Sequence, residues 1–155
     1  MGKDNSKLNI TLCARTFSVQ GGAERFLFNL AKHLQKRDHV VKVITLRAMA
    51  TDGVSLEVVR KPYCVSRVCR DWVYGSRLAS ALLRDDCDVS FGEQKTWHCN
   101  VIRPGGGVED EYWKTHLKYD IPGLHLPQQF RKIYLKRRFD LAAEKRGYTS
   151  PHFRQ

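Results

Sequence analysis

The 155-residue chain has no long hydrophobic run. No stretch approaches the ~20 consecutive apolar residues that a transmembrane helix needs. Residues 1–7 are predominantly polar and lack the basic-then-apolar pattern of a secretory signal. We therefore expect a cytoplasmic protein with a disordered leader over residues 1–7. The remaining residues, 8–155, are of a length suited to one domain with its own core.

Cysteine pairs with a recognisable spacing are also missing. The chain has five cysteines, an odd number: Cys13, Cys64, Cys69, Cys87 and Cys99. None of them forms a CxxC pair, and the histidines do not supply the spacing of a zinc site. Because nothing in the sequence points to an oxidising compartment, we predict free thiols and no metal site.

Acidic residues are scarce relative to basic ones, with 16 Asp and Glu against 27 Lys and Arg, for a net charge of +11. Such a chain is attracted to nucleic acid, to anionic lipid or to a phosphorylated sugar. The excess is concentrated in residues 126–155, where eight basic residues stand against two acidic ones. The composition is otherwise that of a globular protein, which excludes disorder over the whole chain.

The most informative stretch surrounds two glycines, Gly21 and Gly22. An apolar run over residues 8–13 and a predicted loop over 14–20 precede them, and apolar residues at helical spacing follow. This pattern predicts a strand, a glycine turn and a helix over 22–37. Such a turn lets a ligand approach the backbone, and the helix N-terminus offers N–H groups to a phosphate. Because the pattern matches neither GxGxxG nor a Walker A loop, a plain loop-to-helix turn is the alternative.

The rest of the chain continues the alternation of strands and helices. Short, largely apolar segments predict further strands over residues 40–46, 88–92 and 100–103, and alternating apolar and polar residues predict one over 54–59. Further helices are predicted over 67–84, 108–118 and 128–146. This order predicts an α/β fold of the Rossmann-like type, with a mostly parallel open sheet and helices on both faces.

Two motifs in this order resemble a known family. Gly-Gly-Ala-Glu-Arg over residues 21–25 and Asp-His-Val over 38–40 resemble the start of a GT-B retaining glycosyltransferase of family 4. The glycine-rich stretch over 101–113 is similar to the acceptor-side loop of the branch that builds lipopolysaccharide core. The resemblance extends over roughly residues 8–150 and implies the amino-terminal half of a GT-B fold.

The resemblance implies transfer of a hexosyl or heptosyl group from a nucleotide-sugar donor, with retention of configuration and without a cofactor or an essential metal. The acceptor would be lipopolysaccharide core or another lipid-linked glycan. In this family the donor pocket lies in a carboxy-terminal domain with paired glutamates, which nothing in this sequence matches. We therefore expect a truncated, acceptor-side domain that is inactive alone.

On the donor side, the resemblance implies that Gly21, Gly22 and Ala23 approach the diphosphate. Arg15 comes shortly before the glycines and is expected to pair with a phosphate oxygen. A solvated surface arginine is the alternative for Arg15.

The resemblance also implies an acceptor-side set. Its members are Arg103, Gly105, Gly106, Gly107 and His98. Relatives often carry aspartate at the position of Gly106 and histidine at that of Glu109. Glu109 is the catalytic candidate, although a free carboxyl pKa of ~4.3 makes a weak base. The alternatives are a helix-terminal charge for Glu109 and a partly exposed loop residue for His98.

Basic side chains stand beside aromatic ones in the last predicted helix. Its basic members are Lys132, Lys136, Arg137 and Arg138, and its aromatic ones include Phe130, Tyr134 and Phe139. This composition favours peripheral contact with an anionic membrane, the cytoplasmic face of an inner membrane if the resemblance holds. A solvated helix face is the alternative.

Two other functions remain open. A basic nucleic-acid-binding module, without catalysis, fits the charge but lacks a recognised motif. A NAD-dependent oxidoreductase domain lacks both GxGxxG and an acidic residue after the second strand, where Leu46 and Arg47 stand.

Overall fold

The computed structural model describes residues 7–49, 53–60, 63, 66–93, 96–104, 111, 127–149 and 151. The predicted helix over 108–118 lies almost entirely outside this range. The order of the described elements is β1 (Asn9–Phe17), α1 (Gly22–Gln35), β2 (Val40–Ala48), β3 (Ser55–Val58), α2 (Arg67–Leu82), β4 (Val89–Glu93), β5 (Val101–Arg103) and α4 (Pro127–Tyr148).

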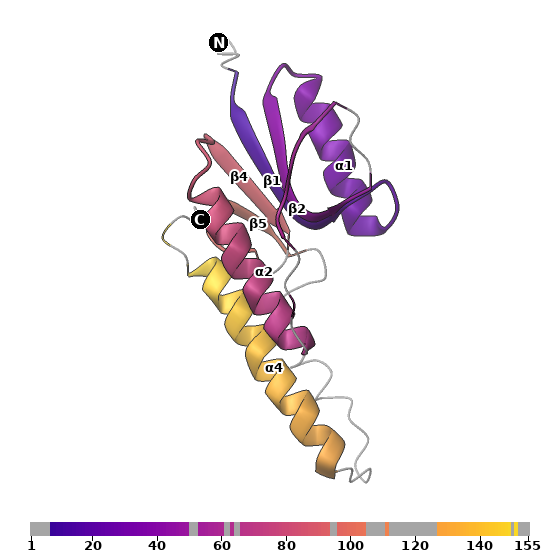
Figure 1. The fold of residues 1–155 in the computed structure, drawn as a ribbon, viewed down its shortest axis with the longest axis vertical. Coiled ribbons are helices and arrows are strands. Elements are labelled where there is room, and N and C mark those ends of the chain that lie inside the picture. Colours follow the sequence, from indigo (N-terminus) through magenta and orange to yellow (C-terminus); the bar gives the residue numbers. More distant parts are fainter. Residues whose placement is uncertain are drawn as a thin grey trace.

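The described strands form one sheet in the order β3-β2-β1-β4-β5, and each neighbouring pair is parallel (Figure 1). At its centre Leu12 of β1 pairs with Val43 of β2 on one side and Phe91 of β4 on the other. The predicted parallel, Rossmann-like α/β fold is confirmed.

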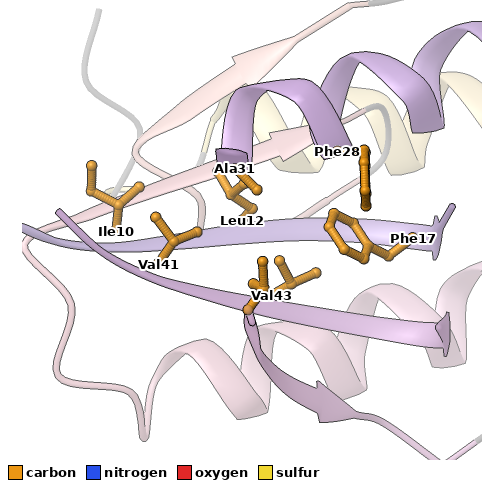
Figure 2. Close-up of a cluster of buried hydrophobic side chains, with 8 residues drawn as sticks. Ile10, Leu12, Phe17, Phe28, Ala31, Val41 and Val43 are labelled. Carbon is orange, nitrogen blue, oxygen red and sulfur yellow. The ribbon is translucent and has the colours of Figure 1, made fainter. Parts of the chain in front are cut away.

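One face of the sheet packs against α1. Figure 2 shows side chains from β1, β2 and α1 meeting in this layer. Its buried members are Ile10, Leu12, Phe17, Phe28, Ala31, Val41, Val43 and Val54. The Phe17 and Phe28 rings lie 5.5 Å apart between centroids. The helix forms where the sequence predicts it because its apolar residues recur at helical spacing.

The other face packs against α2. Successive strand residues point to opposite faces, so Cys13 lies on the face opposite to Leu12. Cys13 and Ile44 are buried there against Tyr74, Leu78 and other residues of α2. The predicted placement of helices on both faces is therefore confirmed.

The last helix, α4, lies beside α2 (Figure 1). It buries Asp140, Ala143 and Glu144, which recur at helical spacing. Trp97 contacts both helices, because it packs against Trp72 and Ala79 of α2 and its indole nitrogen donates a 2.9 Å hydrogen bond to the carbonyl of Ala143 in α4. Phe139 is left 47% exposed on another side of α4.

The first strand is longer than predicted. It does not end at Cys13 but continues to Phe17, with Thr16 paired to Arg47 and Phe17 to Ala48. The sequence obscures this extension because Arg15 and Thr16 are polar. Arg15 therefore lies in a strand and not in the predicted loop.

The described cysteines, Cys13, Cys69, Cys87 and Cys99, are free thiols, as predicted. Cys13 and Cys99 are both buried and hydrogen-bond to each other through their side chains. Burial raises the pKa of Cys13, whereas the hydrogen bond with Cys13 lowers the pKa of Cys99.

Candidate active site

The strand order reverses between β1 and β4. The chain runs from β1 outward through β2 to β3, and then crosses back to β4 and outward to β5. In open parallel sheets, ligands bind outside the carboxyl ends of the strands at such a reversal. The carboxyl ends of β1, β4 and β5 meet at this edge of the sheet. They place there the turn that follows β1, Glu93 at the end of β4 and Arg103 at the end of β5.

The turn after β1 leads directly into α1. The Ser18 hydroxyl accepts a hydrogen bond from the Gln20 N–H and donates one to the Gln20 carbonyl. Gly21 has a φ of +91°, which strongly favours glycine. No side chain caps the helix N-terminus, and nothing lies within 4 Å of the Cβ position of Gly22. The first N–H groups of α1 thus lack a side-chain acceptor, which is the chemistry that suits an anion.

Glu93 and Arg103 are neighbours in the sheet, since they pair in the β4–β5 register. The Arg103 guanidinium lies 4.0 Å from the centroid of the Phe26 ring, which ties β5 to the first turns of α1. One Glu93 oxygen and one Arg103 nitrogen are buried without a hydrogen-bond partner among the described residues. Buried polar atoms of this kind are usually satisfied, which makes this pair a candidate ligand contact.

A second carboxylate contributes to the electrostatics of this edge. Burial raises the pKa of Glu93, and the charge of Glu24 raises it further, while Arg103 opposes both. The Glu24 side chain folds back over Gly21 and occupies the position that a Cβ there would take. Glutamate 93 can therefore hold a proton more readily than an ordinary carboxylate.

Sequence reasoning missed Glu93, Glu24 and Phe26 as site residues. Glu93 is signalled only by its position at the end of a buried strand, next to Gly92. Glu24 belongs to the Gly-Gly-Ala-Glu-Arg motif, but the motif gives it no role of its own, and Phe26 follows as one of the apolar residues of α1.

Arg15 has a protein partner. Its guanidinium lies 2.8 Å from a carboxylate oxygen of Asp71 in α2, and its side chain is 50% exposed. It belongs to the strand face that α2 covers. Phosphate binding by Arg15 stays a prediction, and it would require Arg15 to share or leave Asp71.

The segment between β4 and β5 is packed more closely than an open cleft loop. Thr96, Trp97 and Cys99 are buried. Gly92 makes this possible, because a Cβ there would collide with the side chains of Thr96 and Cys99. His98 is half-buried with a φ of +66°, an uncommon conformation for a residue other than glycine. Its acceptor-side role stays a prediction.

Several predicted residues lie outside the described part of the chain. They are Gly105, Gly106, Gly107 and Glu109, together with the side chains of Lys132 and Lys136. Arg137 is half-buried and Arg138 is exposed.

The described residues contain no group of three or more His, Cys, Asp or Glu side chains arranged to hold a metal ion. No helix within the same residues has the length and apolar character to cross a membrane.

The sheet and this edge define a Rossmann-like domain with a candidate ligand site at the reversal of strand order. The sequence model of Glycosyltransferase Family 4 matches residues 20–99, just over half of the chain. This range begins at the glycine turn and includes β4 with Glu93. The chain belongs to glycosyltransferase family 4.

A solved structure supports the same fold. The crystal structure of WaaG, a glycosyltransferase involved in lipopolysaccharide biosynthesis, is similar with a TM-score of 0.67 and 17% sequence identity. The similarity covers 88% of this chain and 35% of that chain. This chain thus corresponds to about a third of WaaG, a protein of GT-B fold. No curated protein sequence matches the chain significantly.

Proposed function

We propose that this chain is the amino-terminal, acceptor-side domain of a retaining glycosyltransferase. It takes part in moving a sugar from a nucleotide-sugar donor to lipopolysaccharide core or another lipid-linked glycan. Family membership supports sugar transfer. The observation that carries the proposal is the uncapped turn at Gly21 beside the buried polar atoms of Glu93 and Arg103, at the edge where α/β sheets bind ligands.

Each part of this edge has a distinct proposed role. The N–H groups of Gly22 and Ala23 hydrogen-bond the donor diphosphate, which the partial positive charge of the helix N-terminus also attracts. The Arg103 guanidinium pairs with an oxygen of the acceptor. Glu93, with its raised pKa, orients the acceptor hydroxyl. Gly105, Gly106, Gly107 and Glu109 extend the acceptor side in this proposal, and no cofactor or metal takes part.

Catalysis needs a second, donor-binding domain in this proposal, so the described domain alone is inactive. The similarity to only 35% of the WaaG chain supports this division. The donor would lie between the two domains, with its diphosphate against Gly21 and the rest of its nucleotide held by the second domain.

The acceptor role is tested by binding of lipopolysaccharide-core oligosaccharide, measured by isothermal titration calorimetry. Arg103→Gln removes a charge-assisted hydrogen bond and is expected to weaken binding about tenfold or more. Arg37→Gln serves as the control, because Arg37 is exposed beyond the end of α1. Equal affinities for the wild type and Arg103→Gln would reject the acceptor role.

The same glycosyltransferase is proposed to dock on the cytoplasmic face of an inner membrane through α4. Exposed Arg138 and Phe139 stand next to each other on this helix and suit an anionic interface. We expect co-sedimentation with phosphatidylglycerol vesicles that is lost in high salt. The double variant Arg137→Gln/Arg138→Gln should release the protein, whereas Lys36→Gln/Arg37→Gln should not. Equal sedimentation with neutral vesicles would contradict this docking.

A further inference from the structure

A groove of about 340 Å³ lies between β3 and α2, apart from the candidate active site. One wall is formed by residues 57–60, which are the end of β3 and the two residues after it. Its other wall is formed by Arg77, Ser80, Ala81 and Arg84. These four residues recur at intervals of three and four, so they share one side of the helical segment.

The groove is basic. Arg60, Arg77 and Arg84 line it, and none of them has an acidic partner among the described residues. The carboxylate of Glu57 does not neutralise them, because it lies 2.8 Å from the ammonium group of Lys42. Arg77 donates a hydrogen bond to the backbone carbonyl of Arg60, which holds the helix side of the groove against the strand.

The strand beside the groove also has an open backbone edge. β3 is the last strand in the order of the described sheet. The N–H of Val59 donates to the Thr45 carbonyl of β2, at 2.8 Å. Backbone groups of successive residues alternate between the two sides of a strand. Leu56 and Val58 therefore direct their N–H and C=O groups away from β2, where no described strand pairs with them.

We propose that this groove binds an extended acidic peptide segment of a partner protein, which adds to β3 as a further strand. The main chain of the segment pairs with Leu56 and Val58, and its carboxylates meet the arginines. Alternate residues of a strand lie about 7 Å apart on one face. Arg77 lies in α2, and Arg84 follows two residues after its end. A helical rise over these seven residues separates them by about 10 Å, so flexible Glu side chains about 7 Å apart along the strand extend to both.

Charge and backbone chemistry favour this occupant over others. A second copy of this chain also carries a net charge of +11, so it would be repelled. Nucleic acid and anionic lipid match the arginines but have no amide backbone to pair with the strand edge. Only an acidic peptide satisfies both features of the groove.

The test is fluorescence anisotropy with the full chain and a fluorescein-labelled peptide of about seven residues in which Glu and Val alternate. We expect saturable binding that weakens with salt, and no binding of the peptide with Lys in place of Glu. Arg84→Gln should weaken binding about fivefold to tenfold. Arg37→Gln should leave it unchanged. No binding of the Glu–Val peptide, or equal affinity of the Arg84→Gln variant, would overturn the proposal.

A second pair of measurements tests the strand edge. Val58→Pro removes an N–H that points away from β2, so the sheet is expected to persist, as circular dichroism would check. This variant should lose peptide binding. The same peptide with N-methyl groups on alternate amides should fail to bind the wild-type protein. This control changes only the peptide, so it does not depend on the folding of a variant. An unchanged affinity for the N-methylated peptide would refute the proposal. It would also be wrong if DNA or anionic vesicles displaced the peptide and the Val58→Pro variant still bound it.

Discussion

Replacing Trp97 by alanine should destabilise this domain more than any other single change in the layer between α2 and α4. The indole is 2% exposed and packs edge-on against Trp72 with ring centroids 5.0 Å apart. Loss of a buried tryptophan costs about 3–5 kcal/mol. The carbonyl of Ala143 also loses its donor, which adds about 1 kcal/mol. The total of about 4–6 kcal/mol is a large part of the ~5–15 kcal/mol that stabilises a typical domain.

Urea denaturation followed by circular dichroism measures this loss, provided that the variant is still folded without urea. Trp97→Phe keeps an aromatic ring but removes the hydrogen bond to Ala143, so we expect a smaller loss of about 1–3 kcal/mol. Trp72→Ala is the matched control, because Trp72 is only half-buried. If Trp97→Ala costs no more than Trp72→Ala, then Trp97 does not join the helices as described.

Three further predictions concern the candidate active site and the opposite end of the sheet. Gly21→Ala should lower the free energy of unfolding by about 1–3 kcal/mol, because φ is +91° and ψ is 160° there and a Cβ would collide with the Glu24 side chain. Gly22→Ala should be near neutral in the same urea titration. Glu24→Gln should lower the pKa of Glu93 towards its ordinary value by removing a repulsive charge, as carboxyl NMR titration would detect; no change would contradict their proximity. Burial raises the pKa of Asp85, but hydrogen bonds from Lys42 and Thr11 outweigh this effect, so its pKa lies below the ordinary value. Asp85 therefore stabilises the fold above its ordinary pKa of ~3.9 and loses this effect as the pH falls through its lowered value. Asp85→Asn should make stability less dependent on pH in that acidic range, and an unchanged acid unfolding curve would refute the assignment.

Much of the fold follows from local sequence patterns. The sequence segments of β1, β2 and β4 are mostly apolar, because a central parallel strand is buried on both faces. The boundary of β1 was wrong for a specific reason. Arg15 is polar yet lies in the strand, since its charge is paired with Asp71 from a helix more than fifty residues later in the chain. Local hydropathy carries no information about such a partner.

Only part of the candidate site could be predicted from the sequence. The glycine turn has a local signature, because a φ of +91° at Gly21 strongly favours glycine. Glu93 acquires its properties from burial and from Glu24, which are brought to it by the fold. Trp97 likewise belongs to a predicted loop but is buried by contacts with α2 and α4. Such long-range effects depend on topology and not on the residues next to them.

The most direct test of the central claim is an NMR titration of the ¹⁵N-labelled chain with a nucleoside-diphosphate sugar. If the turn after β1 binds the donor diphosphate, the largest amide shifts will be those of Gly21, Gly22 and Ala23, with smaller ones at Glu93. A titration in which these amides do not move, or in which the strongest shifts lie along α4 or β3, would contradict sugar-nucleotide binding at this edge of the sheet.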